Sequence, residues 1–258
     1  MRDGVSVKPI AEQGVLILGG TSGIGLACAE AFTAAGARVL LVGRNPERGT
    51  AAAAGLGPGA GFLRADCAEP GQVEAMVAEA AARLGRIDTL ICSLGGNRLP
   101  ELLFRQSLED IRAALAQDLA PFLYAGRAVL PVMMAQGGGA VINIASDAGK
   151  IATPGESVIG ANMAAIIQFT RGLAIEGKRN GIRANTITPS LVEGTPLTDR
   201  LMQEGSFSAK LFAKARPLAH LGKTFPHDLA NIAIFLASPN AAKITGQAIS
   251  VNGGISAI

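Results

Sequence analysis

Short apolar runs alternate with longer segments of helical periodicity along the whole chain. Several of the short runs are apolar throughout, which is typical of parallel strands buried on both faces. The longer segments carry apolar residues three and four positions apart, which predicts helices with one buried face. The predicted strands span residues 15–18, 38–42, 61–65, 89–93, 140–145, 183–188 and 248–251. The predicted helices span residues 24–35, 73–84, 108–136, 158–176 and 228–237, and another begins at Pro46 after the capping residue Asn45.

This alternation implies right-handed crossovers between parallel strands. We therefore expect a doubly wound α/β fold, with about seven strands in one parallel sheet and helices on both faces. No repeat or linker interrupts the pattern, so residues 1–258 are predicted to form a single domain. Residues 194–217 break the alternation with a long mixture of apolar and polar positions. They are interpreted either as a lid over a substrate or as a short packed surface helix.

Composition narrows the kinds of partner that the chain is expected to have. Of the 258 residues only 17% are charged, the net charge is +3, and the basic residues are scattered, so no nucleic-acid partner is predicted. Residues 1–13 lack an apolar signal core and no apolar run reaches about 18 residues, which predicts a cytoplasmic protein without membrane contact. The three cysteines have no metal-like spacing and are predicted to be buried free thiols, with no metal site.

A glycine motif follows the first predicted strand and leads into a helix. Its bare backbone can approach a pyrophosphate, whose charge is met by free N–H groups and by the helix dipole. A strand before the glycines and a helix after them make this a strong signature of a Rossmann-type dinucleotide site. The predicted contacts are Gly19, Thr21, Ser22, Gly23, Ile24 and Gly25.

The end of the second strand bears on the choice of dinucleotide. A carboxylate there would bind the ribose 2′-hydroxyl of NAD, but this chain has Gly43 followed by Arg44. A guanidinium suits a 2′-phosphate, so NADP(H) is favoured over NAD(H). The alternative is that Arg44 is only a solvated surface residue.

Further motifs extend the pattern to the end of the chain. Asp66 follows the third strand, the segment 182–185 leads to Pro189, and Thr-Gly-Gln at 245–247 precedes Val-Asn-Gly-Gly at 251–254. With the glycine motif, these features resemble the short-chain dehydrogenase/reductase family over nearly the whole chain. The resemblance implies a nicotinamide-dependent oxidoreductase that acts on a small molecule and forms homotetramers or dimers. It also implies further cofactor contacts from Asp66, Cys67, Ser93, Gly95, Pro189 and Thr195.

The catalytic positions of that family are only partly kept. The family uses an Asn-Ser-Tyr-Lys tetrad, in which the tyrosine exchanges the proton, the lysine lowers its pKa and the serine polarises the carbonyl. In the matching register Ser146 retains the serine, whereas Ile159 and Met163 replace the tyrosine and the lysine, and Asp118 replaces the asparagine. Ser146 and Asp118 are therefore the catalytic candidates. Pro121 predicts either a helix kink near Asp118 or a bend in a surface helix.

Three functions remain open at this point. The first is an oxidoreductase acting on a carbonyl, hydroxyl or imine group without the usual acid–base pair, with Asp118 or Asp147 supplying the proton if burial raises its pKa. The second is a catalytically inactive nucleotide-binding or regulatory subunit, assembled with an active homologue. The third is a scaffold reused for non-redox chemistry. The wider Tyr-x6-Lys spacing of related enoyl reductases would place Glu156 and Met163 in the two roles and restores neither.

Overall fold

In the computed structural model, which describes residues 7–95 and 98–257, seven strands form one parallel sheet. Their order is β3-β2-β1-β4-β5-β6-β7, so the direction of winding reverses between β1 and β4. The strands are β1 (Gly14–Leu18), β2 (Arg38–Gly43), β3 (Ala60–Arg64), β4 (Thr89–Cys92), β5 (Gly139–Ile144), β6 (Ile182–Thr188) and β7 (Ala248–Ser250). Every predicted strand is present, with bounds within one residue, and the doubly wound fold class is confirmed.

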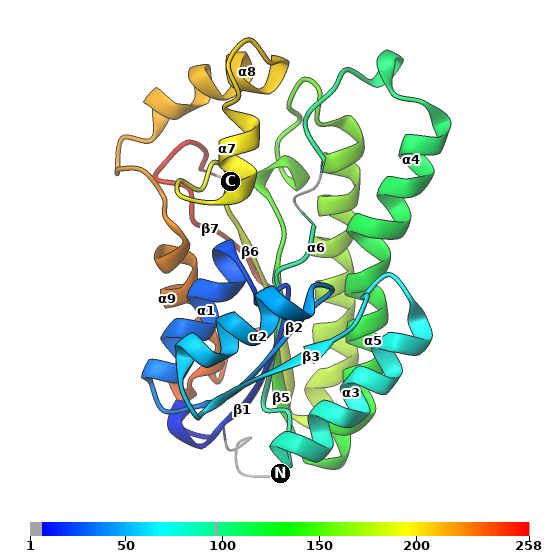
Figure 1. Cartoon of the computed structure of the whole chain (residues 1–258), viewed down its shortest axis with the longest axis vertical. Coiled ribbons are helices and arrows are strands. Elements are labelled where there is room, and N and C mark those ends of the chain that lie inside the picture. Colours follow the sequence, from blue (N-terminus) through cyan, green and yellow to red (C-terminus); the bar gives the residue numbers. More distant parts are fainter. Residues whose placement is uncertain (1–6, 96–97, 258) are drawn as a thin grey trace.

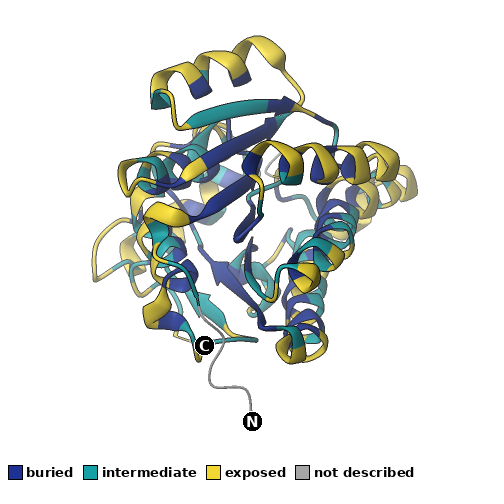
Figure 2. Cartoon of the chain, turned by 90° about the horizontal axis from the view of Figure 1, so that it is seen from below, coloured by how far each residue is buried: buried dark blue, intermediate teal, exposed yellow. Residues whose placement is uncertain are grey.

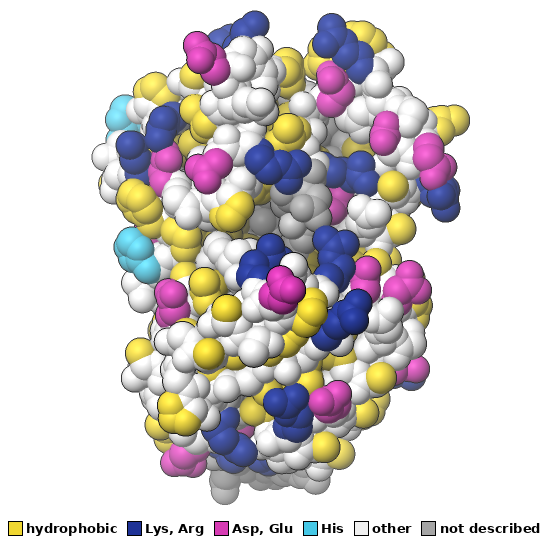
Figure 3. Space-filling model, in the orientation of Figure 1, with side chains coloured by type: hydrophobic (Ala, Val, Ile, Leu, Met, Phe, Trp, Pro, Cys, Tyr) yellow, Lys and Arg dark blue, Asp and Glu magenta, His cyan; other side chains and the backbone are white. Residues whose placement is uncertain are grey.

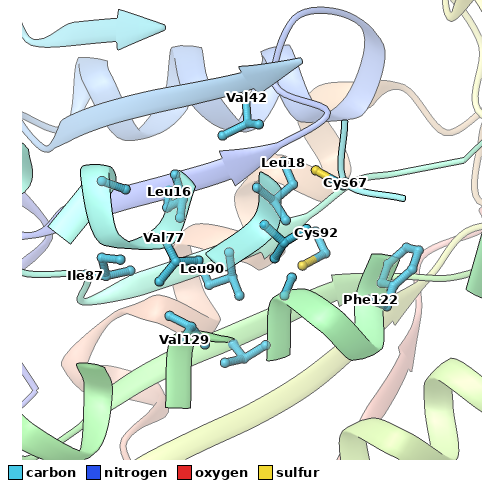
Figure 4. Packing of buried hydrophobic residues seen from close by; sticks show 14 of the residues in the cluster. Leu16, Leu18, Val42, Cys67, Val77, Ile87, Leu90, Cys92, Phe122 and Val129 are labelled. Atoms are coloured by element: carbon cyan, nitrogen blue, oxygen red, sulfur yellow. The ribbon is translucent and has the colours of Figure 1, made fainter. Parts of the chain in front are cut away.

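Helices cover both faces of the sheet (Figure 1). One face carries α1 (Gly23–Ala34), α2 (Pro46–Leu56) and α9 (Pro226–Ala237), and the other carries α3 (Pro70–Leu84), α5 (Ala120–Ala135) and α6 (Ser157–Gly177). Successive residues of β1 point to opposite faces, so Leu16 and Leu18 join one apolar cluster and Ile17 joins the other. Figure 4 shows the first cluster, and Figure 2 shows buried strands inside a shell of helices with exposed outer faces.

Local sequence signals fix where several helices begin. The side chain of Asn45 accepts a hydrogen bond from the Arg48 backbone N–H at 2.8 Å, and Pro46 occupies the first turn of α2, as predicted. At the start of α4 (Leu108–Ala114), Ser107 and Asp110 form a capping box. These caps satisfy N–H groups that have no partner within the helix.

The segment predicted as one helix over residues 108–136 is interrupted. After α4 comes a π-helical turn, η3 (Leu115–Leu119), and only then α5. Pro121 lies in the first turn of α5, where its missing N–H and its ring disrupt the regular α-helical ladder. The predicted helix is therefore not continuous: a π-helical turn interrupts it at Asp118. Pro121 is buried where α5 begins, and a kink at this point stays a prediction.

Residues 194–217 fold into short helices above the sheet (Figure 1). They form α7 (Pro196–Leu201), α8 (Phe207–Ala215) and the beginning of a 3₁₀ turn, η6 (Arg216–Leu218). Leu201 and Phe212 pack with Leu191 in a small apolar cluster of their own. The segment is thus packed helical structure, and its movement over a substrate stays a prediction.

Among the described residues one helix, Ser157–Asn180, is long and apolar enough to cross a membrane by length and composition. It comprises α6 and the turn that follows it. α6 packs against β6, α5 and the sheet-edge turn η4 (Asp147–Gly149), so we assign it to the core. The three cysteines are buried and free, as predicted.

Candidate active site

The phosphate-binding loop between β1 and α1 is shaped by close backbone contacts. Gly19 and Gly23 have φ angles of 74° and 53°, which favour glycine. A Cβ atom on Gly25 would lie 2.3 Å from the carbonyl oxygen of Gly19, and one on Gly19 would lie 2.1 Å from that of Ser93. Ser22 precedes α1 without capping it through its side chain, so the first N–H groups of the helix remain available to an anion.

Two arginines stand beside this loop on the side of β2 and β3. Arg48 donates from Nε to the hydroxyl of Thr21 at 3.2 Å. Arg44 lies close enough to Cys67 to lower the pKa of its thiol, although burial dominates and raises that pKa to about 12. Gly43 ends β2 with no carboxylate. Sequence reasoning missed Arg48, whose signal was its place in the first turn of α2, three residues after Asn45.

The turn after β3 forms the far end of the site. Asp66 accepts a hydrogen bond from the Ala68 backbone N–H at 3.0 Å, and its own N–H donates to the side chain of Gln72 at 3.0 Å. These bonds hold the turn that carries Asp66 and Cys67 past the end of the sheet. Because its high pKa keeps the Cys67 thiol neutral, that residue would contact a ligand through packing and backbone.

The segment that leads into α7 reaches the phosphate loop from the other side. Thr195 caps α7 by accepting from the Thr198 backbone N–H at 3.2 Å, and its Cβ lies 3.8 Å from the position of a Cβ on Gly23. The backbone carbonyl of Pro189, after β6, accepts from the Asp147 N–H at 2.9 Å. Both predicted residues therefore lie at the carboxyl edge of the sheet.

The two catalytic candidates lie past the carboxyl ends of neighbouring strands, Ser146 after β5 and Asp118 beside the loop after β4. Cys92 pairs with Asn143, so Gly95 and Ser146 each stand three residues beyond a matched pair. Asp118 reaches from η3 to within 3.9 Å of the position of a Cβ on Gly95. Figure 3 shows Lys and Arg side chains gathered on this face of the molecule, between α2 and α7.

The positions of the missing tyrosine and lysine lie on α6, which packs against the turn after Ser146. A Cβ on Gly160 would lie 2.7 Å from the carbonyl oxygen of Ala148, and one on Gly149 would lie 2.9 Å from the Cβ of Met163. Ile159 and Met163 thus stand beside the serine turn, where neither can donate a proton or carry a charge. The scaffold of the tetrad is kept while two of its functional groups are absent.

Asp118 forms an ion pair that the sequence did not reveal. Its Oδ2 atom lies 2.8 Å from Nε of Arg98, and the two side chains are 11% and 24% exposed. Burial raises the pKa of Asp118, while the charge and hydrogen bond of Arg98 lower it in part. Arg98 is an isolated charge in the loop after β4, and nothing in its local sequence marks it as part of the site.

Asp147, the other carboxylate considered as a proton source, is engaged by the C-terminal segment. Its oxygens accept hydrogen bonds from the hydroxyls of Ser250 at 3.0 Å and Ser256 at 2.8 Å, and from the side-chain amide of Asn252. This buried cluster ties the chain end to the turn after Ser146. The role that the contacts support for Asp147 is therefore structural.

Glu156 is the remaining carboxyl near these positions. It precedes the first turn of α6, three residues before Ile159. Burial raises the pKa of Glu156, and a hydrogen bond with the Thr153 side chain lowers it in part. Its neighbour Gly155 accepts a backbone hydrogen bond from Glu101 at 2.9 Å and packs against Phe207 of α8.

Comparison with known proteins agrees with this geometry. A family model described as enoyl-(acyl carrier protein) reductase matches residues 19–256. The 3-oxoacyl-(acyl-carrier-protein) reductase FabG of Chlamydia pneumoniae is 34% identical over 247 residues, which are 93% of this chain and 96% of that protein. D-threitol dehydrogenase of Mycolicibacterium smegmatis is 34% identical over 243 residues, covering 93% and 91% of the two chains.

A solved structure gives the same result. A short-chain type dehydrogenase/reductase from Mycobacterium ulcerans superimposes with a TM-score of 0.86 at 27% identity, covering 94% of this chain and 89% of that one. The chain belongs to the short-chain dehydrogenase/reductase family of oxidoreductases.

Proposed function

We propose that the protein binds NADP(H) in preference to NAD(H) and uses it to reduce a carbonyl or imine group of a small molecule, or to oxidise the corresponding hydroxyl. The observation that carries the cofactor preference is the pair of arginines after β2, which ends without a carboxylate: Arg44 follows the strand near Cys67, and Arg48 bonds to the Thr21 hydroxyl. Two guanidinium groups favour a 2′-phosphate through charge-assisted hydrogen bonds.

The proposed cofactor contacts follow the carboxyl edge of the sheet. The loop glycines allow the pyrophosphate to approach the start of α1, and the turn after β3 receives the adenine. The nicotinamide would lie near the ends of β4 and β6. The proposed set is Gly19, Thr21, Ser22, Gly23, Ile24, Gly25, Arg44, Asp66, Cys67, Ser93, Gly95, Pro189 and Thr195.

The chemistry would proceed without the family's usual acid. A bound reduced nicotinamide supplies the hydride, and the protein has to orient the acceptor and stabilise the charge that forms on it. Ser146 would donate a hydrogen bond to the acceptor oxygen. Loss of a positioned general acid slows such reactions by about 10²–10⁴-fold, and a substrate that is already protonated, such as an iminium ion, would lose less.

A titration tests the cofactor assignment. NADPH and NADH are each added to the protein while binding is followed by nicotinamide fluorescence, and the experiment is repeated with Arg44→Ala and with Arg127→Ala, an exposed arginine on α5. NADPH is expected to bind more tightly than NADH, and only Arg44→Ala should remove the difference. Equal affinities in the unaltered protein would contradict the preference.

A second measurement tests turnover. NADPH consumption is followed with a panel of ketones, diketones, thioesters of 3-oxo acids and cyclic imines. Oxidation of NADPH that depends on one of these acceptors supports an oxidoreductase. NADPH binding without turnover of any acceptor favours the alternative, a regulatory subunit paired with an active homologue. Apolar residues such as Ile159 and Met163 are expected at the tyrosine and lysine positions of a protein that no longer catalyses the reaction.

Self-association and a cytoplasmic location are part of the same proposal. The short turn η2 (Leu103–Arg105) and α4 expose Leu103, Phe104 and Leu108 by 51%, 80% and 85%, and apolar side chains grouped in this way mark surfaces that another chain covers. We expect a homotetramer or dimer formed by one domain per chain, with residues 194–217 acting as the lid over the substrate. Light scattering of the purified protein measures the oligomeric state directly.

A further inference from the structure

The nicotinamide half of the site carries an ion pair in place of the missing tyrosine and lysine. Arg98 and Asp118 meet at 2.8 Å, beside Gly95 and at the level of Ser146 past the ends of β4 and β5. The π turn holds Asp118 there, and the carboxylate in turn holds Nε of Arg98. A charged group is thus fixed close to where the hydride acceptor would stand.

The bond through Nε leaves the terminal nitrogens of the guanidinium available. Within residues 7–95 and 98–257, the hydrogen bond of the Arg98 side chain is the one from Nε to Asp118. The pKa of Asp110, in the first turn of α4, is lowered mainly by hydrogen bonds with Ser107 and also by the charge of Arg98, so a second carboxylate lies near the guanidinium. The side chain is 24% exposed, so a ligand can reach it from solvent. A planar guanidinium anchored at one edge presents its remaining N–H groups in a fixed direction.

The other charged groups around the site do not offer the same function. The Asp147 carboxylate is occupied by three donors from the C-terminal segment. The Oδ2 atom of Asp118 is already engaged by Nε of Arg98, so this carboxyl holds the guanidinium in place. Besides the Ser146 hydroxyl, the Arg98 guanidinium is therefore the charged donor that the described residues bring beside Gly95.

We propose that Arg98, positioned by Asp118, donates hydrogen bonds from its terminal nitrogens to the substrate oxygen that becomes negatively charged during reduction. This inference rests on the function proposed above and names the group that replaces the tyrosine and lysine. Arg98 is the catalytic residue in it and Asp118 is a positioning residue.

The step balances without a protein acid. Hydride and its electron pair reach the carbonyl carbon, the carbon–oxygen π pair moves to oxygen, and the alkoxide is stabilised by the Arg98 guanidinium. The alkoxide then takes a proton from water, and the hydroxide that remains is neutralised by the buffer. Preorganised donors of this kind contribute about 10²–10³-fold to kcat, which offsets part of the loss of a general acid.

Steady-state kinetics of four single variants test the proposal, with acetoacetyl-coenzyme A, diacetyl and a cyclic imine as probes and NADPH as the reductant. Arg98→Met should lower kcat about 100- to 1,000-fold, and Arg98→Lys should recover part of it because the charge returns without the planar fork. Asp118→Asn should lower kcat less. Arg105→Met, in the nearby turn η2, is the matched control, because this exposed guanidinium contacts Glu101 and the Phe104 ring; kcat should stay within about twofold of the unaltered protein.

A double variant separates positioning from general stability. If Asp118 acts through Arg98, Asp118→Asn should cost nothing further in the Arg98→Met background. NADPH affinity and melting temperature are measured for every variant, so that loss of folding or of cofactor is recognised. Should Arg98→Met prove unstable, the kcat values of Arg98→Lys and Asp118→Asn are compared with those of the unaltered protein and Arg105→Met instead.

Each outcome decides the proposal. A fall in kcat confined to Arg98 and Asp118 variants that still bind NADPH supports it. Unchanged kcat in Arg98→Met overturns it and leaves the oxidoreductase standing. A higher KM with unchanged kcat also overturns it, because Arg98 would then bind a substrate anion equally well before and during reaction. If the unaltered protein binds NADPH but turns over none of the probes, both the proposed function and this inference fail.

Discussion

The two halves of the candidate cofactor site are built from different parts of the chain. In the phosphate half, backbone packs on backbone, with 2.1 Å between the Cβ position of Gly19 and the carbonyl oxygen of Ser93. In the nicotinamide half, the functional positions are side chains on helices and turns that pack well without them. A side chain such as the one at position 159 can be exchanged while α6 stays in place, whereas a glycine of the loop cannot. A binding site made of backbone therefore tolerates fewer substitutions than a site made of side chains.

The largest effect should come from restoring the exchanged groups. The double variant Ile159→Tyr/Met163→Lys adds a phenol and an ammonium group to α6. Because α6 already packs beside the turn after Ser146, both groups would lie near the serine. We expect kcat for NADPH oxidation by diacetyl to rise about 10²–10⁴-fold, the usual contribution of a positioned acid.

The matched control is Ile159→Phe/Met163→Leu, which changes size without adding chemistry. Equal rates in the two double variants would mean that α6 no longer holds positions 159 and 163 in a catalytic geometry, in addition to lacking the tyrosine and the lysine. The contrast between the halves would then be wrong.

Gly25→Ala tests the backbone-built half. The added methyl group would lie 2.3 Å from the Gly19 oxygen, so the loop has to move away from the start of α1. NADPH affinity should fall at least 100-fold in calorimetry. Gly55→Ala on α2, where no atom lies within 4 Å, is the control and should raise the free energy of unfolding by about 0.4–1 kcal/mol. Retained NADPH binding in Gly25→Ala would contradict the account of the loop.

Arg48→Ala sharpens the contrast within the phosphate half, because it removes a side chain from a site made mostly of backbone. Its Nε–Thr21 contact at 3.2 Å places it beside the expected 2′-phosphate. NADPH affinity should fall about 10-fold in a fluorescence titration, while NADH affinity changes little. A parallel loss for both dinucleotides would assign Arg48 to the loop's structure instead.

The smallest expected effect concerns stability in the nicotinamide half. Burial raises the folded-state pKa of Glu156, so its ionised form destabilises the fold at neutral pH. Glu156→Gln should melt at a slightly higher temperature than the unaltered protein at pH 8. The difference should shrink as pH falls through the raised folded pKa and disappear below the ordinary value of 4.5.

Thermal melts across this pH range check the sign, with Glu74→Gln on the exposed face of α3 as the control. A lower melting temperature for Glu156→Gln at pH 8 would mean that the carboxylate is stabilised by a partner.

Sequence reasoning succeeded where the signal was local. Strands such as β1 are continuous apolar runs in the sequence, and the glycine loop is a short motif between a strand and a helix. The start of α2 follows from Asn45 and Pro46 for the same reason. These features depend on residues that are neighbours in the chain.

The features that escaped depend on contacts between distant segments. Arg98 and Asp118 lie twenty residues apart and meet only because the π turn and the loop after β4 converge. The tie between Asp147 and the chain end spans more than a hundred residues. Pro121 predicted a kink, but the extra residue that makes a π turn depends on the packing of α4 and α5, which no local pattern encodes.

That π turn has a consequence for how the site can evolve. A π turn amounts to one residue inserted into a regular helix, a change of a single codon. The position of residue 118 in the site thus depends on the number of residues in the turn. The side chain at that position can be substituted without changing this number. Removing one residue between positions 115 and 119 would straighten the helix and rotate its first part by about a quarter turn, carrying Asp118 out of the site with every amino-acid type around it unchanged. Homologues that keep the number of residues in this turn can therefore present a different side chain, with a different reactivity, at position 118.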